Sequence, residues 1–105
     1  MEKKDLLEPT KNIVLIGFGK KTFEKLMQWY ASKGLKFKSG VSTLQYKPFK
    51  EYGKHLGIFH KNFMENKGEY ADMSKFFKSK VRIEAGITKG QYEFVKINDF
   101  FKTID

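Results

Sequence analysis

The stretch Lys47–Met64, KPFKEYGKHLGIFHKNFM, decides what fold the sequence leads us to expect. Four of its apolar residues recur at intervals of four, three and four positions, a spacing typical of one face of an α-helix: Tyr52, Leu56, Phe59 and Phe63. Pro48 suits the first helical turn, where its missing N–H group costs no hydrogen bond. We therefore predict one amphipathic helix over 47–65, with Phe59 in the middle of its buried face.

Three lysines of the same stretch fall on a second face of this helix, because they stand at positions i, i+4 and i+11: Lys50, Lys54 and Lys61. One side of the helix would anchor in the core while the other presents ammonium groups to a partner. His55 is near the basic face and is expected to contact a phosphate. His60 lies beside the apolar residues and is expected to be packed inside.

Toward the N-terminus, the sequence predicts a flexible lead-in over residues 1–11, followed by a strand and a helix. Asn12–Phe18, NIVLIGF, is β-branched and apolar, as is typical of a buried strand. Thr22 is a suitable N-cap for a helix that extends to Ser32. Gly34 then stands at the position after the helix where glycine is favoured.

The segments on either side of the central stretch are shorter. Alternating apolar and polar residues predict two strands, 35–38 and 41–47, joined by a turn. After the central stretch we expect a third helix over 72–84, capped by its first residue. A strand over 92–96 and a final short helical turn over 98–104 complete the chain.

This order of elements, β-α-β-β-α-α-β, predicts one α+β domain over residues 12–105. Its sheet would be small, mainly antiparallel and packed with about three helices. Residues 80–97 leave two alternatives open: a helix-turn-helix with Gly86 in the turn, or the end of a helix followed by a hairpin. Gly90 inside the second helix and the nearly neutral charge of the region favour the hairpin.

The composition excludes several classes of protein. The chain of 105 residues contains no cysteine, which excludes disulfide bridges, thiolate zinc sites and a cysteine nucleophile. No apolar run approaches the roughly 18 residues of a membrane span. The first residues lack the apolar stretch of a signal peptide. We therefore expect a cytoplasmic protein that does not contact a membrane.

The formal net charge of +9 is concentrated in the first two-thirds of the chain. Residues 11–67 contain twelve lysines and three glutamates, whereas acids and bases nearly balance elsewhere. Such a one-sided field favours an anionic partner, most often nucleic acid. Because Arg82 is the only arginine, we expect attraction to the backbone rather than base reading by arginine. An AT-rich genome would produce the same lysine excess, so a merely solvated surface is the alternative.

No constellation typical of catalysis or of metal binding stands out. His55 and His60 are five residues apart, which separates them by about 140° on a helix, and no cluster of acids accompanies them. Neither paired carboxylates at helical spacing nor a Ser-His-Asp arrangement can be recognised. We therefore predict no enzymatic activity, no cofactor and no metal.

The sequence instead predicts a binding surface made of lysines, one histidine and one aromatic residue. The helix N-terminus at 20–22, after the run IGFGKKT, offers free N–H groups for one phosphate, although a tight strand-to-helix turn explains the run equally well. Trp29 falls off the apolar face of its helix and is expected to be partly exposed. The predicted binding residues are Lys20, Lys21, Lys25, Trp29, Lys47, Lys50, Lys54, His55 and Lys61.

The C-terminal half resembles a family of short phage proteins. His55–Phe59 shows an H-x-x-x-F pattern, a short acidic loop with Glu65, Glu69 and Asp72 follows, and FFKSKVRIEAG occupies residues 76–86. These features are similar to those of NinB-type proteins from phage recombination regions. The resemblance implies a phage origin and the handling of single-stranded DNA, and it carries over no catalytic residue.

Two functional hypotheses follow from the sequence. The first is a small basic accessory protein, encoded by a phage or mobile element, that binds the phosphate backbone of nucleic acid with little sequence specificity. The alternative is a phage-encoded inhibitor or adaptor, of the anti-defence or host-takeover type, that docks its basic face on an acidic surface of a host protein.

Overall fold

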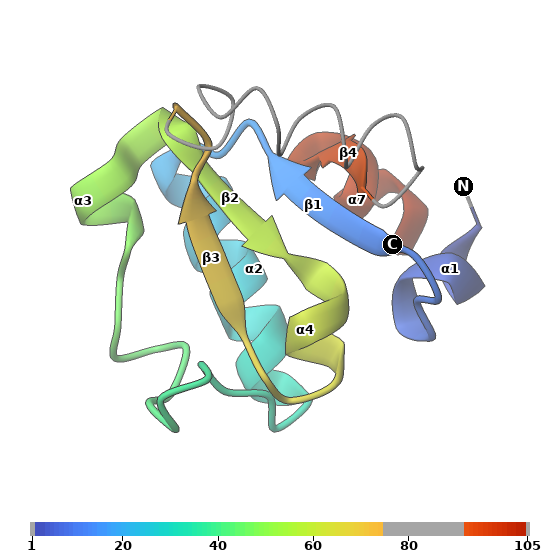
Figure 1. The fold of residues 1–105 in the computed structure, drawn as a ribbon, viewed down its shortest axis with the longest axis horizontal. Coiled ribbons are helices and arrows are strands. Elements are labelled where there is room, and N and C mark those ends of the chain that lie inside the picture. Colours follow the sequence, from blue (N-terminus) through green and yellow to red (C-terminus); the bar gives the residue numbers. More distant parts are fainter. Residues whose placement is uncertain (1, 75–91, 105) are drawn as a thin grey trace.

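The computed structural model of the chain describes residues 2–74 and 92–104, which form a four-stranded sheet with helices packed against it (Figure 1). In spatial order, the strands are β3 (Glu69–Asp72), β2 (Leu56–Phe59), β1 (Asn12–Ile16) and β4 (Tyr92–Lys96). β1 pairs antiparallel with β2 and β2 with β3, whereas β1 and β4 are parallel. The predicted α+β class with a mainly antiparallel sheet is confirmed.

Five helices and one 3₁₀ turn accompany the sheet in the described ranges: α1 (Lys3–Leu7), α2 (Lys20–Ser32), α3 (Phe49–Tyr52), η1 (Gly53–His55), α4 (His60–Met64) and α7 (Ile97–Ile104). The order of elements agrees roughly with the prediction, since β1, α2, β4 and α7 lie where the sequence places them. No helix in this part of the chain is long and apolar enough to cross a membrane.

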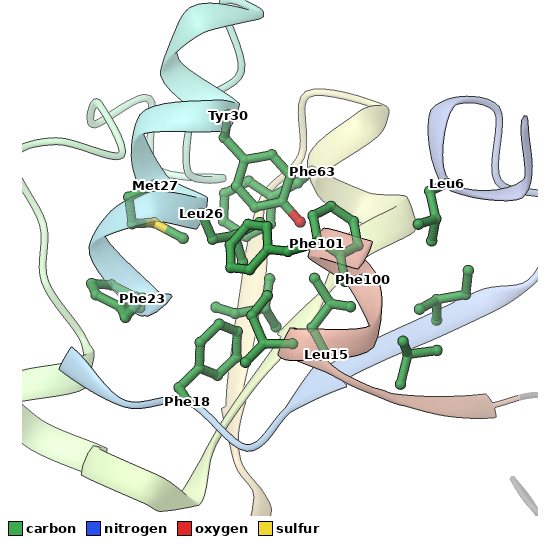
Figure 2. Packing of buried hydrophobic residues seen from close by; sticks show 14 of the residues in the cluster. Leu6, Leu15, Phe18, Phe23, Leu26, Met27, Tyr30, Phe63, Phe100 and Phe101 are labelled. Atoms are coloured by element: carbon green, nitrogen blue, oxygen red, sulfur yellow. The ribbon is translucent and has the colours of Figure 1, made fainter. Parts of the chain in front are cut away.

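Most of the core lies on one face of the sheet. The strands contribute alternate side chains to it: Ile13, Leu15, Leu56, Ile58 and Val95. Figure 2 shows Tyr30 of α2, Phe63 of α4 and Phe100 of α7 meeting in this core. The rings of Tyr30 and Phe63 are stacked, with centroids 4.4 Å apart and planes at 5°. The opposite face of the sheet carries a smaller cluster around Val14 and Met73.

A buried histidine connects three helices through hydrogen bonds. His60 of α4 is fully buried, as predicted from its place beside the apolar residues. Its Nδ1 lies 2.7 Å from the hydroxyl of Tyr30 in α2, and its Nε2 lies 2.6 Å from the carbonyl oxygen of Leu6 in α1. A carbonyl only accepts, so the Nε2–H donates to Leu6 and Nδ1 accepts from Tyr30. Burial lowers the pKa of His60 to about 4, which keeps the ring neutral.

The predicted helix over 47–65 is wrong, because this segment forms α3, η1, β2 and α4 in succession. Gly53 adopts φ 56° and ψ −133°, a conformation outside the helical region that favours glycine, and it ends α3. Leu56 and Ile58 then point to the main core, as the period of a strand requires, while Phe59 packs against the smaller cluster. A short apolar run such as LGIF fits a strand as well as a helix.

The two predicted strands over 35–38 and 41–47 are isolated bridges in the structure. Lys36 pairs with Ser42, and Phe37 pairs with Gly68 beside β3. Gly68 has little space around it, since a Cβ atom there would lie 2.6 Å from the carbonyl oxygen of Lys36. Hydrogen bonds of Lys36, Lys38 and Tyr46 with residues 66–70 hold the hairpin beside the start of β3, although 41–47 do not join the sheet as a strand.

Other expectations fall partly outside the described residues. Residues 3–7 belong to the expected flexible lead-in but form α1, whose Leu6 is fully buried. Of the predicted helix over 72–84, the structure describes only the start, where Asp72 Oδ1 accepts the N–H of Ser74 at 2.9 Å. The helix-turn-helix alternative for 80–97 is wrong at its end, because 92–96 form β4, and its remaining residues up to 91 lie outside the description.

Candidate functional site

A cleft of about 490 Å³ lies between the first turns of α2 and the short helix α3. Lysines from both segments and two phenylalanine rings form most of its walls. Its lining residues are Lys20, Phe23, Glu24, Lys47, Phe49 and Lys50. We call this site the basic cleft.

The turn from β1 to α2 places Lys20 in the cleft. Gly17 has φ 78°, a left-handed conformation that favours glycine, and it turns the chain sharply away from the strand. The N–H of Gly19 donates to Thr22 Oγ1 at 2.8 Å, which closes the turn at the start of the helix. The run IGFGKKT thus forms a tight strand-to-helix turn. The free N–H groups of the first helical turn add a partial positive charge beside Lys20.

The opposite wall of the basic cleft is held by aromatic packing. Phe49 of α3 stacks on Phe23 of α2, with ring centroids 5.6 Å apart and planes at 20°. Pro48 is buried beside Phe49. This contact anchors α3 on the start of α2, so that Lys47 and Lys50, which flank the anchored residues, face the same space as Lys20.

The charge of the basic cleft is not neutralised from within. Lys20, Lys47 and Lys50 are exposed, and none of them forms an ion pair with any residue that the structure describes. Glu24 is the one acid among the lining residues. Three ammonium groups therefore converge on one cleft against a single carboxylate, which is the arrangement that attracts an anion with more than one negative oxygen.

Three further predicted residues lie beside the basic cleft without lining it. Lys21 is exposed in the first turn of α2. Lys54 and His55 are exposed in η1, which follows α3 directly. They extend the positive surface along the chain on both sides of the cleft.

Lys25 and Trp29 of α2 are engaged in packing. The Lys25 Nζ lies 4.3 Å from the centroid of the Phe101 ring. The indole of Trp29 is half-buried and meets Phe100 edge to face at 5.5 Å. The Nζ of Lys33 lies 4.7 Å from the indole ring, so one face of Trp29 is already occupied.

Lys61 is not part of the basic cleft, and the predicted shared face of Lys50, Lys54 and Lys61 does not form. Lys61 belongs to α4, which Figure 1 shows at the opposite end of β2 from α3. Its Nζ lies 3.9 Å from a carboxylate oxygen of Glu65. The shared face required one continuous helix, and the strand β2 now separates its two halves.

Sequence reasoning missed a second hollow, of about 740 Å³, between the hairpin and the start of β3. Its walls are mostly apolar, and we call it the aromatic groove. Its lining residues are Phe37, Lys38, Ser39, Val41, Tyr46, Gly68, Glu69 and Tyr70. The one signal in the sequence is that Val41, Leu44 and Tyr46 follow a turn yet are large and apolar. They stay exposed because the hairpin never joins the sheet as a strand.

In the part of the chain that the structure describes, no group of three or more histidine, aspartate or glutamate side chains is placed to hold a metal ion. Comparisons of the chain with models of protein families, with curated proteins and with solved structures found no match.

Proposed function

We propose that this protein binds nucleic acid by holding phosphate groups of the backbone in the basic cleft. The observation that carries the proposal is that Lys20, Lys47 and Lys50, from two separate segments, line one cleft and form no ion pair among the residues that the structure describes. A phosphodiester chain offers an anionic oxygen at every step, and lysine ammonium groups neutralise such charges while releasing counterions. The role is one of binding, with no catalytic step of its own.

Binding of this kind distinguishes little between sequences. Lysine acts as a compact point charge, whereas specific reading of bases depends mostly on the fork of arginine. The chain has one arginine among its 21 basic residues. Contacts to phosphate fix the position of a protein on the strand but carry no direct sequence information.

The aromatic groove favours a second candidate, an adaptor or inhibitor that docks on an acidic protein. Leu44 is 53% exposed beside Val41 and Tyr46, and exposed apolar groups near one another are typical of protein interfaces. In this case the basic cleft would meet carboxylates of the partner rather than phosphates.

The test is the salt dependence of binding to fluorescein-labelled DNA and RNA, measured by fluorescence anisotropy. The three lysines of the cleft, with Lys21 and Lys54 beside it, make about five. If these lysines neutralise phosphates, log K should fall with log salt at a slope of about −3.5 for single strands and about −4.5 for duplexes. The double variant Lys47→Glu/Lys50→Glu should weaken binding at least tenfold at moderate salt.

The matched control is Lys3→Glu/Lys4→Glu, which changes the net charge equally. Both residues are exposed on α1, which Figure 1 shows at the opposite side of the molecule from α3. This variant should weaken binding much less. A slope near zero, or an equal loss in both double variants, would mean that the basic cleft is not the binding site.

A further inference from the structure

We propose that the aromatic groove receives one unpaired base of a single-stranded nucleic acid whose backbone is held in the basic cleft. This inference rests on the proposed function and deepens it by naming the form of nucleic acid that the protein binds.

The groove has the size and the chemistry of a site for a flat, uncharged group. Its volume of about 740 Å³ lies within the range of roughly 300–1,000 Å³ that is usual for small-ligand sites. The rings of Phe37, Tyr46 and Tyr70 form its apolar walls. A nucleobase presents apolar faces and a polar edge, so it can stack on such walls whatever its identity.

The ring of Tyr46 is exposed and held in one position. It is 37% exposed, yet it meets Phe37 edge to face at 5.3 Å, and its hydroxyl is hydrogen-bonded to that of Tyr70. Tyr70 is supported in turn by Tyr52, with centroids 5.5 Å apart. A ring that is fixed before binding loses little conformational freedom when a base stacks on it.

The rim of the groove does not repel an anionic strand. Glu69 is the one acid in the lining, and both of its oxygens are occupied. Lys38 Nζ donates to one oxygen at 2.8 Å and Asn62 Nδ2 donates to the other at 2.8 Å. The ion pair with Lys38 offsets the charge of Glu69, so the groove is close to neutral while the nearby cleft is positive.

One single strand can extend from one site to the other, because Tyr46 lines the aromatic groove and the next residue, Lys47, lines the basic cleft. In a duplex the bases are paired and stacked inside, so filling the groove requires a single strand or a base turned out of the helix.

The test compares fluorescein-labelled dT15 with a dT15·dA15 duplex, with the variants Tyr46→Ala and Tyr46→Trp. The wild-type protein should bind dT15 at least fivefold more tightly than the duplex. Tyr46→Ala should weaken binding to dT15 at least fivefold and leave duplex binding unchanged, whereas Tyr46→Trp keeps an aromatic ring and should retain tight binding. The same assay with rU15 extends the comparison to RNA.

Photocrosslinking gives a readout that needs no variant. A dT15 strand with one 5-iodouracil should crosslink to Tyr46 or Tyr70, which peptide mass spectrometry can locate.

Equal affinity for dT15 and duplex, an unchanged dT15 affinity in Tyr46→Ala, or crosslinks only elsewhere would overturn the inference. If Lys47→Glu/Lys50→Glu still weakens binding at least tenfold in that case, the proposed function stands and the groove serves another ligand, such as an apolar side chain of a protein. If wild-type protein binds no nucleic acid, both proposals fail.

Discussion

Residues 47–55 and residues 56–63 are neighbours in the chain but differ in almost every physical respect. The first segment contains α3 and η1, neither of which has a buried residue, and it supplies two lysines to the basic cleft. The second contains β2 and the start of α4, where Leu56, Ile58, His60 and Phe63 are fully buried. Gly53, with its positive φ, marks the change from one to the other.

The two segments therefore have different roles: the first supplies binding residues, and the second stabilises the fold. The first segment is attached through the aromatic rings of Phe49 and Tyr52, so we expect charge changes at its lysines to alter the surface and leave the core intact. The second segment holds the middle of the sheet and the contacts among α1, α2 and α4, so changes there act on the free energy of unfolding.

The largest effect is expected at Phe63, in the buried segment. Its ring stacks on Tyr30 and meets Phe37 edge to face at 5.3 Å, so Phe63→Ala should lower the free energy of unfolding by about 3–5 kcal/mol. Phe59 is only partly buried against the smaller cluster, and Phe59→Ala should cost about half as much or less. Urea denaturation of both variants measures the difference. A larger loss of stability in Phe59→Ala would contradict the observed fold, in which the main core and Phe59 lie on opposite faces of the sheet.

The next largest effect is a pH dependence that comes from His60. Burial lowers its pKa to about 4 from an ordinary value of 6.5, against the opposing hydrogen bond to Leu6. Between these values the unfolded chain takes up a proton that the folded chain does not. The stability from neutral His60 is therefore complete above about pH 6.5 and is lost as the pH falls toward 4, by about 3 kcal/mol in all and about 2 kcal/mol between pH 7 and 5.

Denaturation curves at a series of pH values test this expectation. The variant His60→Gln should lose most of the slope between pH 7 and 5, whatever its absolute stability. His55→Gln is the matched control, because it removes the exposed histidine of η1 and leaves His60 in place. Equal slopes in the wild-type protein and His60→Gln would show that His60 is not buried in its neutral form.

Secondary structure could be predicted where the spacing of apolar residues fits either a strand or a helix but not both. β1 is a continuous apolar run, and α2 has apolar residues at helical spacing before Gly34, whose φ of 75° fits the predicted end. The predicted N-cap is wrong, because the helix begins at Lys20 after Gly19 and Thr22 is its third residue. At 56–59 the helical and the strand patterns overlap in the same four residues. Pairing with β1 and β3 decides in favour of the strand, and pairing partners are not visible in a local pattern.

The candidate site was predictable to a similar degree. The charge distribution and the helical spacing together predict Lys20, Lys47 and Lys50 as binding residues, and the structure places all three in one cleft. The prediction of Lys61 depends on one continuous helix, and the strand β2 separates Lys61 from that cleft. The aromatic groove depends on contacts between residues 24 positions apart, such as Tyr46 and Tyr70, which no local spacing reveals.

The smallest effect is expected at Lys61, and it tests directly how residues 47–64 are folded. On one continuous helix, Lys50 and Lys61 would share a face, and reversing either charge would weaken binding to an anionic strand about equally. In the observed fold Lys50 lines the basic cleft, whereas Lys61 lies on α4 at the other end of β2 and pairs with Glu65. At about 0.15 M salt the screening length is about 8 Å, so a charge outside the cleft contributes little.

We therefore expect Lys50→Glu to weaken binding to labelled dT15 about fivefold or more, and Lys61→Glu by less than about twofold. The two variants carry the same net charge, so the total field of the protein does not account for a difference between them. Both lysines lie on the surface, and circular dichroism should show an unchanged fold in each variant. Comparable losses in the two variants would indicate that the anion contacts both halves of the segment. Binding would then not be confined to residues 47–55.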